Sequence, residues 1–323
     1  MRTILLALLC LMTLGAGAPT FGAERPYRAP RTVFGQPNLQ GVWSNATFTF
    51  LERPLSAPHV VMTPEEAAMA AAKMRQDNPL PAGLDVGQDD SERITFDMGE
   101  GFSRVRGEIR AGMIVDPVDG RLPYRPEALK RFGLDQPQNP LAHRDNPEDR
   151  SLTERCILGE DASPPLVPSP DSNYIQIIQT RNQVALYSEK YHELRIVRLY
   201  DRHAPSVITS WDGDEIGWWE GDTLVIETTN FPPTAQLRFG RLRLSNATTV
   251  LERFTRTSSG ELLYEVKVTD PTLYTQSWRA EVPFKASSAR ILEDACHEGN
   301  YSLPGILAGA REDDRASARS DGR

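Results

Sequence analysis

GWWEGDTLVIETTNF, residues 217–231, is the stretch that decides the fold class of this chain. Trp218 and Trp219 lead into the polar turn Glu220-Gly221-Asp222, and an apolar, β-branched run follows the turn. A short polar turn that contains glycine, between two runs of this kind, is typical of a β-hairpin. Similar strand–turn–strand units recur between residues 174 and 296, which predicts a curled antiparallel sheet for this part of the chain.

The predicted strands have a two-residue period and are separated by turn signals such as Arg181-Asn182. Many short strands joined by short turns favour a closed barrel or a sandwich, and a barrel has no exposed edges. We predict a mainly β protein, an antiparallel meander that closes into a barrel, with a few short peripheral helices. The strands are expected at 174–180, 184–189, 193–199, 207–211, 216–219, 223–229, 248–257, 261–269, 277–284 and 290–296.

Residues 1–23 have the features of a secretory signal peptide. Arg2 precedes an apolar run at 4–14, and small residues allow cleavage after Ala18 or Ala23. The run is too short to span a bilayer, and no later apolar run approaches that length. We therefore expect a periplasmic or secreted protein with no membrane insertion after cleavage.

The remaining chain is predicted to form an N-terminal part, a barrel and a tail. The N-terminal part holds an extended lead-in, a first strand at 47–50 and a helix that starts at Thr63 and ends near Gln76. The expected division is the signal peptide at 1–23, the N-terminal part packing on the barrel at 24–172, the barrel body with a terminal helix at 173–311, and a disordered tail at 312–323.

Composition excludes several classes of function. The chain is 39% apolar and 25% charged with a net charge of −8, so nucleic acid is a poor candidate partner. It contains no Walker loop, dinucleotide fingerprint or G-x-S-x-G motif, so we expect no organic cofactor. The histidines show no metal-ligand spacing, and we predict no metal. The oligomeric state stays open.

Cys156 and Cys296 are the two cysteines of the mature chain. In an oxidising compartment such a pair most often forms one disulfide, which is the predicted state. The alternative is that one of them is a nucleophilic thiol.

Six segments of the chain carry a family resemblance: residues 37–43 PNLQGVW, 149–156 DRSLTERC, 192–195 HELR, 219–231 WEGDTLVIETTNF, 251–256 LERFTR and 295–301 ACHEGNY. As an ordered set they resemble a family of uncharacterised exported proteins of soil bacteria, for which no activity is established. Its relatives carry two arginines where this chain has Ile216 and Trp218. If these positions line a pocket, the resemblance implies a less anionic and more apolar or aromatic ligand than that of the relatives. The Gly41-Val42-Trp43 motif also resembles the first strand of the calycin barrels, the lipocalins and their kin.

Two histidines are candidate catalytic bases because each lies at a predicted strand end within a family-matching segment. His192 has Glu189 as a possible orienting carboxylate and Arg195 to stabilise negative charge. His297 is followed by Glu298. The alternatives are that His192 is a polar rim residue and that His297 and Glu298 only build a turn. His59, His143 and His203 are expected to be solvated.

The aromatic side chains are candidates for holding a substrate, or they simply fill the barrel. Glu252 and Arg253 lie on one predicted strand and Glu265 on the next, so Arg253 and Glu265 are a plausible cross-strand pair. The aromatic substrate-binding candidates are Trp43, Trp211, Trp218, Trp219 and Tyr191.

Two functions remain open. The first is an exported acid–base enzyme of the lyase, isomerase or hydratase type, acting on a small apolar or aromatic molecule in a barrel pocket. The second is a non-catalytic periplasmic binding or carrier protein for a hydrophobic ligand. A pH profile separates them, because imidazole catalysis titrates between about pH 5 and 8 and apolar binding does not.

Overall fold

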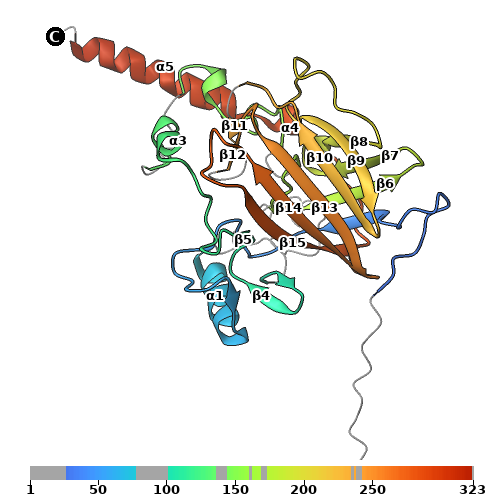
Figure 1. The fold of residues 1–323 in the computed structure, drawn as a ribbon. Coiled ribbons are helices and arrows are strands. Elements are labelled where there is room, and N and C mark those ends of the chain that lie inside the picture. Colours follow the sequence, from blue (N-terminus) through green and yellow to red (C-terminus); the bar gives the residue numbers. More distant parts are fainter. Residues whose placement is uncertain are drawn as a thin grey trace, which may run out of the picture.

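A computed structural model describes residues 27–77, 101–135, 144–159, 162–168, 173–233, 236–237 and 242–321. Its centre is a closed barrel of nine strands (Figure 1), so the predicted mainly β barrel with few helices is confirmed. Strand β1 closes the barrel by pairing with both β6 and β15. Around the barrel the strands are β1 (Gly41–Ser44), β6 (Tyr174–Gln179), β7 (Gln183–Ser188), β8 (Leu194–Leu199), β9 (Asp214–Glu220), β10 (Thr223–Thr229), β13 (Thr249–Ser258), β14 (Glu261–Thr269) and β15 (Trp278–Ser287).

One neighbouring pair departs from the predicted antiparallel meander, because β8 and β9 are parallel. The connection 200–213 therefore returns the chain to the end of the barrel where β8 began. A strand was expected at 207–211, but Val207 is 87% exposed and this segment pairs with no strand. His203 fastens the connection to the outer wall through Asp214 (Nδ1···Oδ2 2.7 Å) and Glu227 (Nε2···Oε1 3.1 Å).

The barrel lumen is packed with side chains that alternate inward along each strand. At one end the lead-in brings the fully buried Leu39 into the core, where its carbonyl accepts a hydrogen bond from Nε1 of Trp43. At the other end the buried residues 162–168, which we call the plug, reach the inward-facing Tyr264. The largest fully buried side chains include Trp43, Trp278, Tyr264, Tyr274, Phe254 and Phe284.

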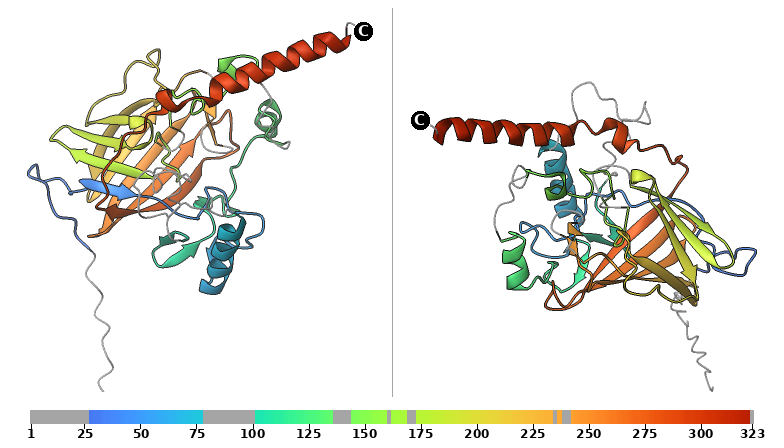
Figure 2. Two further views of the ribbon diagram at one scale, coloured as in Figure 1. Left: turned by 180° about the vertical axis from the view of Figure 1, so that it is seen from behind. Right: turned by 90° about the horizontal axis from the view of Figure 1, so that it is seen from above.

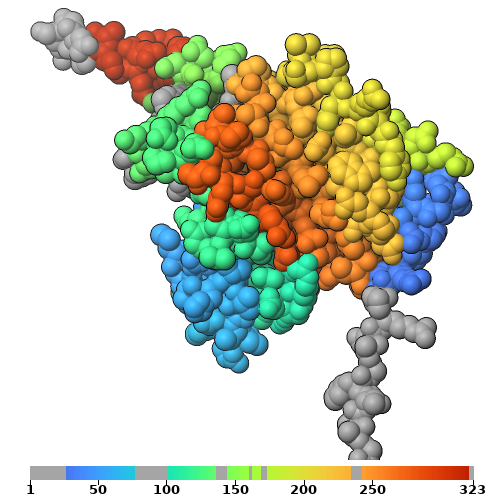
Figure 3. All heavy atoms as spheres, in the orientation of Figure 1, coloured from blue at the N-terminus to red at the C-terminus, as the bar shows by residue number. Residues whose placement is uncertain are grey.

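Strand β1, Leu39 and the plug belong to the barrel and its core, and the rest of the described N-terminal part lies beside the barrel. Its blue and green residues pack against the orange strands in the space-filling view (Figure 3). Its helix α1 (Pro64–Asp77) begins with the expected reciprocal cap between Thr63 and Glu66. Strand β5 (Ile114–Asp116) adds to β15 outside the closed ring. The other elements here are β2 (Val61–Met62), β3 (Arg104–Val105) and β4 (Glu108–Arg110), which form a small sheet, and the helices α3 (Pro126–Arg131) and η1 (Pro147–Asp149).

The C-terminal helix α5 (Ser302–Asp321) projects from the body (Figure 2) and includes most of the tail predicted to be disordered. Its charges lie at helical spacing, with ion pairs between Arg311 and Asp314 and between Arg315 and Glu312. Such pairs support a polar helix, whereas composition alone indicates disorder. The predicted signal peptide and His143 lie outside the described residues.

Three further local predictions differ from the structure. The first barrel strand is β1 and not residues 47–50, of which 47–49 are buried and Phe50 is exposed. Arg253 and Glu265 are opposite in register, but Arg253 pairs with Glu220 and Glu265 with Arg106. No strand forms at 290–296; residues 288–295 continue from β15 without a turn or bend, and we call them the strap. The short pair β11 (Gln236–Leu237) and β12 (Arg243–Leu244) completes the sheets.

Candidate functional site

The turn after β7 is held in an uncommon backbone conformation. It is the short helix η2 (Lys190–His192), in which Tyr191 has a φ of 58° and His192 a φ of 52°. Non-glycine residues rarely adopt the left-handed region. The turn is fastened to the strap, since Asp294 accepts a hydrogen bond from the backbone N–H of Tyr191 (2.9 Å) and donates its own N–H to Nε2 of His192 (3.0 Å).

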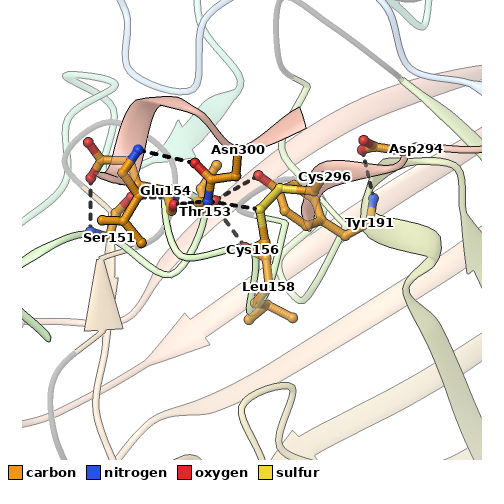
Figure 4. Close-up of a disulfide and its surroundings, with 10 residues drawn as sticks. Ser151, Thr153, Glu154, Cys156, Leu158, Tyr191, Asp294, Cys296 and Asn300 are labelled. Atoms are coloured by element: carbon orange, nitrogen blue, oxygen red, sulfur yellow. Dashed lines mark hydrogen bonds between the residues drawn. A yellow bond between two sulfur atoms is a disulfide. The ribbon is translucent and has the colours of Figure 1, made fainter. Parts of the chain in front are cut away.

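The predicted disulfide between Cys156 and Cys296 is present, so neither sulfur is a free nucleophile. Cys296 begins helix α4 (Cys296–Gly299) directly after the strap, and Cys156 precedes the plug. Figure 4 shows Asn300 beside this bridge, donating to the carbonyl of Glu154 (2.8 Å). The hydroxyl of Tyr191 also bonds to this segment, at the carbonyl of Thr153 (2.9 Å). One crosslink therefore joins the strap to the segment that leads into the plug.

An open groove of about 700 Å³ lies between the strap and the outer wall of the barrel. Its floor consists of outward side chains from three adjacent strands: Val42 pairs in register with Gln176, and Gln176 with Tyr187. The rings of Tyr187 and His192 are nearly parallel, with centroids 6.2 Å apart. The described lining consists of Val42, Gln176, Tyr187, His192, Ala289, Arg290, Ile291, Leu292 and Glu293.

The hydrogen bonds of His192 and Glu189 define what these two predicted catalytic residues do. Nε2 of His192 accepts a hydrogen bond from the backbone N–H of Asp294. This partner assigns the tautomer, because a neutral ring that accepts at Nε2 carries its proton on Nδ1. The buried carboxylate of Glu189 accepts the backbone N–H of Leu292 (3.0 Å). Both side chains hold the strap in place, and His192 can present an N–H donor from a fixed ring.

The other predicted catalytic residues lie elsewhere. His297 and Glu298 are exposed on α4, and among the described residues they are not part of the groove lining. Arg195 points into the barrel lumen and is fully buried. The structure thus bonds both Glu189 and His192 to the strap, with His192 alone of the two in the described groove lining, and it separates them from Arg195.

The predicted aromatic ligands are also dispersed. Trp43 is 1% exposed in the core, and Trp219 packs against that core from the inner face of β9. Trp218 lies on the outer face and bonds to Glu220, while Trp211 is 38% exposed on the connection after β8. Tyr191 stands beside the groove but bonds to Thr153, as described above.

Sequence reasoning missed Tyr187 and the strap as parts of a site. Tyr187 is an aromatic residue on the outward face of a strand and lies close to His192 in the chain. These two features were the signal in the sequence that could have identified it as part of the site. Residues 290–296 of this region were predicted as another barrel strand, so nothing in the sequence indicated that the strap forms a wall of the groove.

Arg195 belongs to a buried polar cluster in the lumen. Its Nε donates to Glu215 (2.5 Å), and its two terminal nitrogens donate to the two oxygens of Glu252 (3.1 and 2.5 Å). The hydroxyl of Tyr264 donates to Glu252 (2.9 Å) and accepts the backbone N–H of Leu166 in the plug (3.0 Å). This network ties β8, β9, β13, β14 and the plug together.

The electrostatics of this lumen cluster are set by burial. Desolvation raises the pKa of Glu215 to about 7, although Arg195 opposes this change. Burial disfavours the charge on Arg195 as well, but the carboxylates of Glu215 and Glu252 hold its pKa well above the usual value. Within the described residues, Oε2 of Glu215 and the hydroxyl of its cross-strand neighbour Thr228 have no hydrogen-bond partner.

The described residues contain no group of three or more His, Cys, Asp or Glu side chains placed to hold a metal ion. No helix in these same residues has the length and apolar character to cross a membrane.

The fold and the groove define a closed, mixed nine-stranded barrel with an external cleft. No family model, curated protein or solved structure matches this chain. The barrel is consistent with the calycin resemblance, and membership of the soil-bacterial family stays a prediction.

Proposed function

We propose that this protein is an exported, non-catalytic binding protein that takes a small, largely apolar or aromatic ligand in the groove beside His192. The observation that carries the proposal is the groove itself, whose volume of about 700 Å³ suits a small molecule. Val42, Ile291 and Leu292 supply apolar surface, and the nearly parallel rings of Tyr187 and His192 supply aromatic surface. The polar side chains of the lining, Gln176, Arg290 and Glu293, can bond to a polar group of the ligand.

The hydrogen bonds at this site favour binding over acid–base turnover. A general base needs a free nitrogen or carboxylate oxygen within reach of the substrate proton. Nε2 of His192 and Oε2 of Glu189 instead accept backbone N–H groups of the strap. A fixed Nδ1–H donor suits recognition of a ligand acceptor such as a carbonyl or hydroxyl oxygen. The disulfide fits the proposed oxidising compartment, periplasmic or extracellular.

The acid–base enzyme is the second candidate, and it would place the chemistry in the lumen cluster. That cluster is buried and lies apart from the groove, so a substrate would have to displace side chains of the packed lumen to reach it. A carboxyl with a pKa of about 7 next to Arg195 can exchange a proton at neutral pH. Incubation of a bound compound separates the two candidates. A compound recovered unchanged supports binding alone, and one converted by the wild type but not by Glu215→Gln supports the enzyme.

The groove is tested with the fluorescent probe anilinonaphthalene sulfonate. Tyr187→Ser should weaken its binding at least tenfold, because the aromatic face is lost. Ile178→Ser is the matched control, since Ile178 is an exposed residue of the same outer wall that does not line the groove. Equal losses in both variants, or no loss in either, would refute the groove as the ligand site.

A further inference from the structure

The strap offers an unpaired backbone edge. The N–H groups of Leu292 and Asp294 are taken by Glu189 and His192. The intervening N–H groups of Ile291 and Glu293 have no partner in the part of the chain that the structure describes. In an extended segment successive N–H groups point to opposite sides. One edge of the strap is therefore fastened to the barrel. On the other edge the N–H of Ala289 donates to the hydroxyl of Ser287 (3.0 Å), and the N–H groups of Ile291 and Glu293 are the ones without a partner among the described residues.

The strap also runs in the same direction as the groove floor. It leaves β15 next to β1, where Ser287 pairs with Val42, and it reaches His192 just beyond the end of β7. The floor row of Val42, Gln176 and Tyr187 crosses the same strands. Three strands about 4.8 Å apart give a row about 10 Å long, which is the length of about three extended residues.

We propose that the ligand of the groove is a short extended peptide whose main chain pairs with the strap at Ile291 and Glu293. This rests on the proposed function, because it names the class of ligand for the same groove. Addition of a strand to a free edge draws affinity from main-chain hydrogen bonds, and alternate side chains give specificity. Here alternate side chains of the peptide face the row that contains Tyr187, and an apolar or aromatic residue fits there.

The test compares two probes on the mature, disulfide-bonded protein. The first is a blocked pentapeptide of alternating threonine and valine, and the second is the same peptide N-methylated at alternate amides. N-methylation removes main-chain donors and blocks strand pairing while it keeps the apolar side chains. Calorimetry should give an affinity at least tenfold weaker for the methylated peptide if methylation falls on the pairing amides, so both methylation registers are measured.

A protein variant gives an independent test. Ile291→Pro removes the N–H at that position and should weaken binding of the unmethylated peptide at least tenfold. Ile291→Val retains the N–H and nearly all of the apolar surface and should change it far less. Anilinonaphthalene sulfonate binding reports whether the groove survives each change, and the two peptide probes do not depend on any variant folding correctly.

The outcomes separate the two proposals. Equal binding of the methylated and unmethylated peptides in both registers overturns strand pairing. Binding of the fluorescent probe without any peptide binding overturns the peptide proposal and leaves the proposed function in place. Absence of binding by either kind of probe overturns both.

Discussion

Glu215→Gln is predicted to remove a pH dependence of stability that originates in the barrel lumen. Glu215 is 5% exposed, and burial raises the pKa of its carboxyl from an ordinary 4.5 to about 7. An acid whose pKa is raised by folding stabilises the folded state below its unfolded pKa, and this stability is lost as pH rises through the folded pKa. The relevant window is therefore from about pH 4.5 to about pH 7.

The expected magnitude follows from the same two pKa values. At about 1.4 kcal/mol per pKa unit, ionising Glu215 in the folded chain costs about 3 kcal/mol more than in the unfolded chain. The wild-type free energy of unfolding should fall by up to that amount between pH 5 and pH 8. Glutamine cannot ionise, so the variant should lack this component.

Urea unfolding followed by tryptophan fluorescence at several pH values measures the difference. The remaining titrating groups are shared by both proteins and cancel in the comparison. Glu220→Gln is the matched control, since Glu220 lies at an exposed hairpin end and should leave the wild-type slope unchanged. Identical slopes in the wild type and Glu215→Gln would refute a protonated lumen carboxyl near neutrality.

Three more substitutions test the framework around the site. Cys156→Ser opens a bridge that spans 140 residues, and loop entropy predicts a loss of about 5 kcal/mol at most; an unchanged urea midpoint would contradict this. Tyr264→Phe leaves the N–H of Leu166 without its partner and should lower the unfolding free energy by about 1–3 kcal/mol; a gain in thermal stability would contradict the role of this bond. His203→Ala should make the connection 200–213 more susceptible to limited proteolysis while the barrel stays resistant. Unchanged cleavage would show that the hydrogen bonds of His203 do not hold this connection in place.

The strands were predictable from sequence because their side chains alternate between core and solvent. The pairs β9–β10 and β13–β14 follow directly from short polar turns at Glu220-Gly221-Asp222 and Ser258-Ser259-Gly260. The parallel junction was not predictable. Residues 207–211 contain Val207, Ile208 and Trp211 and resemble a strand, but they lie exposed, and the hydrogen bonds of His203 hold the connection instead.

The site was only partly predictable for a different reason. The segment around His192 and the disulfide were visible in the sequence as isolated features. The proton position on His192 depends on the backbone of Asp294, which lies 102 residues away in the chain. Arg195 looked like an anion-stabilising neighbour of His192, but strand alternation turns it into the lumen, where Glu252 comes from a strand 57 residues further on. Contacts at such separations leave no local pattern.

The most direct test of the proposed groove is amide chemical-shift mapping by NMR as anilinonaphthalene sulfonate is added to the mature protein. Binding in the groove predicts saturable shifts confined to the amides of Tyr187, His192 and strap residues such as Ile291. Shifts centred on another surface, such as the smaller cavity of about 210 Å³ between β2 and α1, would contradict it. So would the absence of any saturable shift.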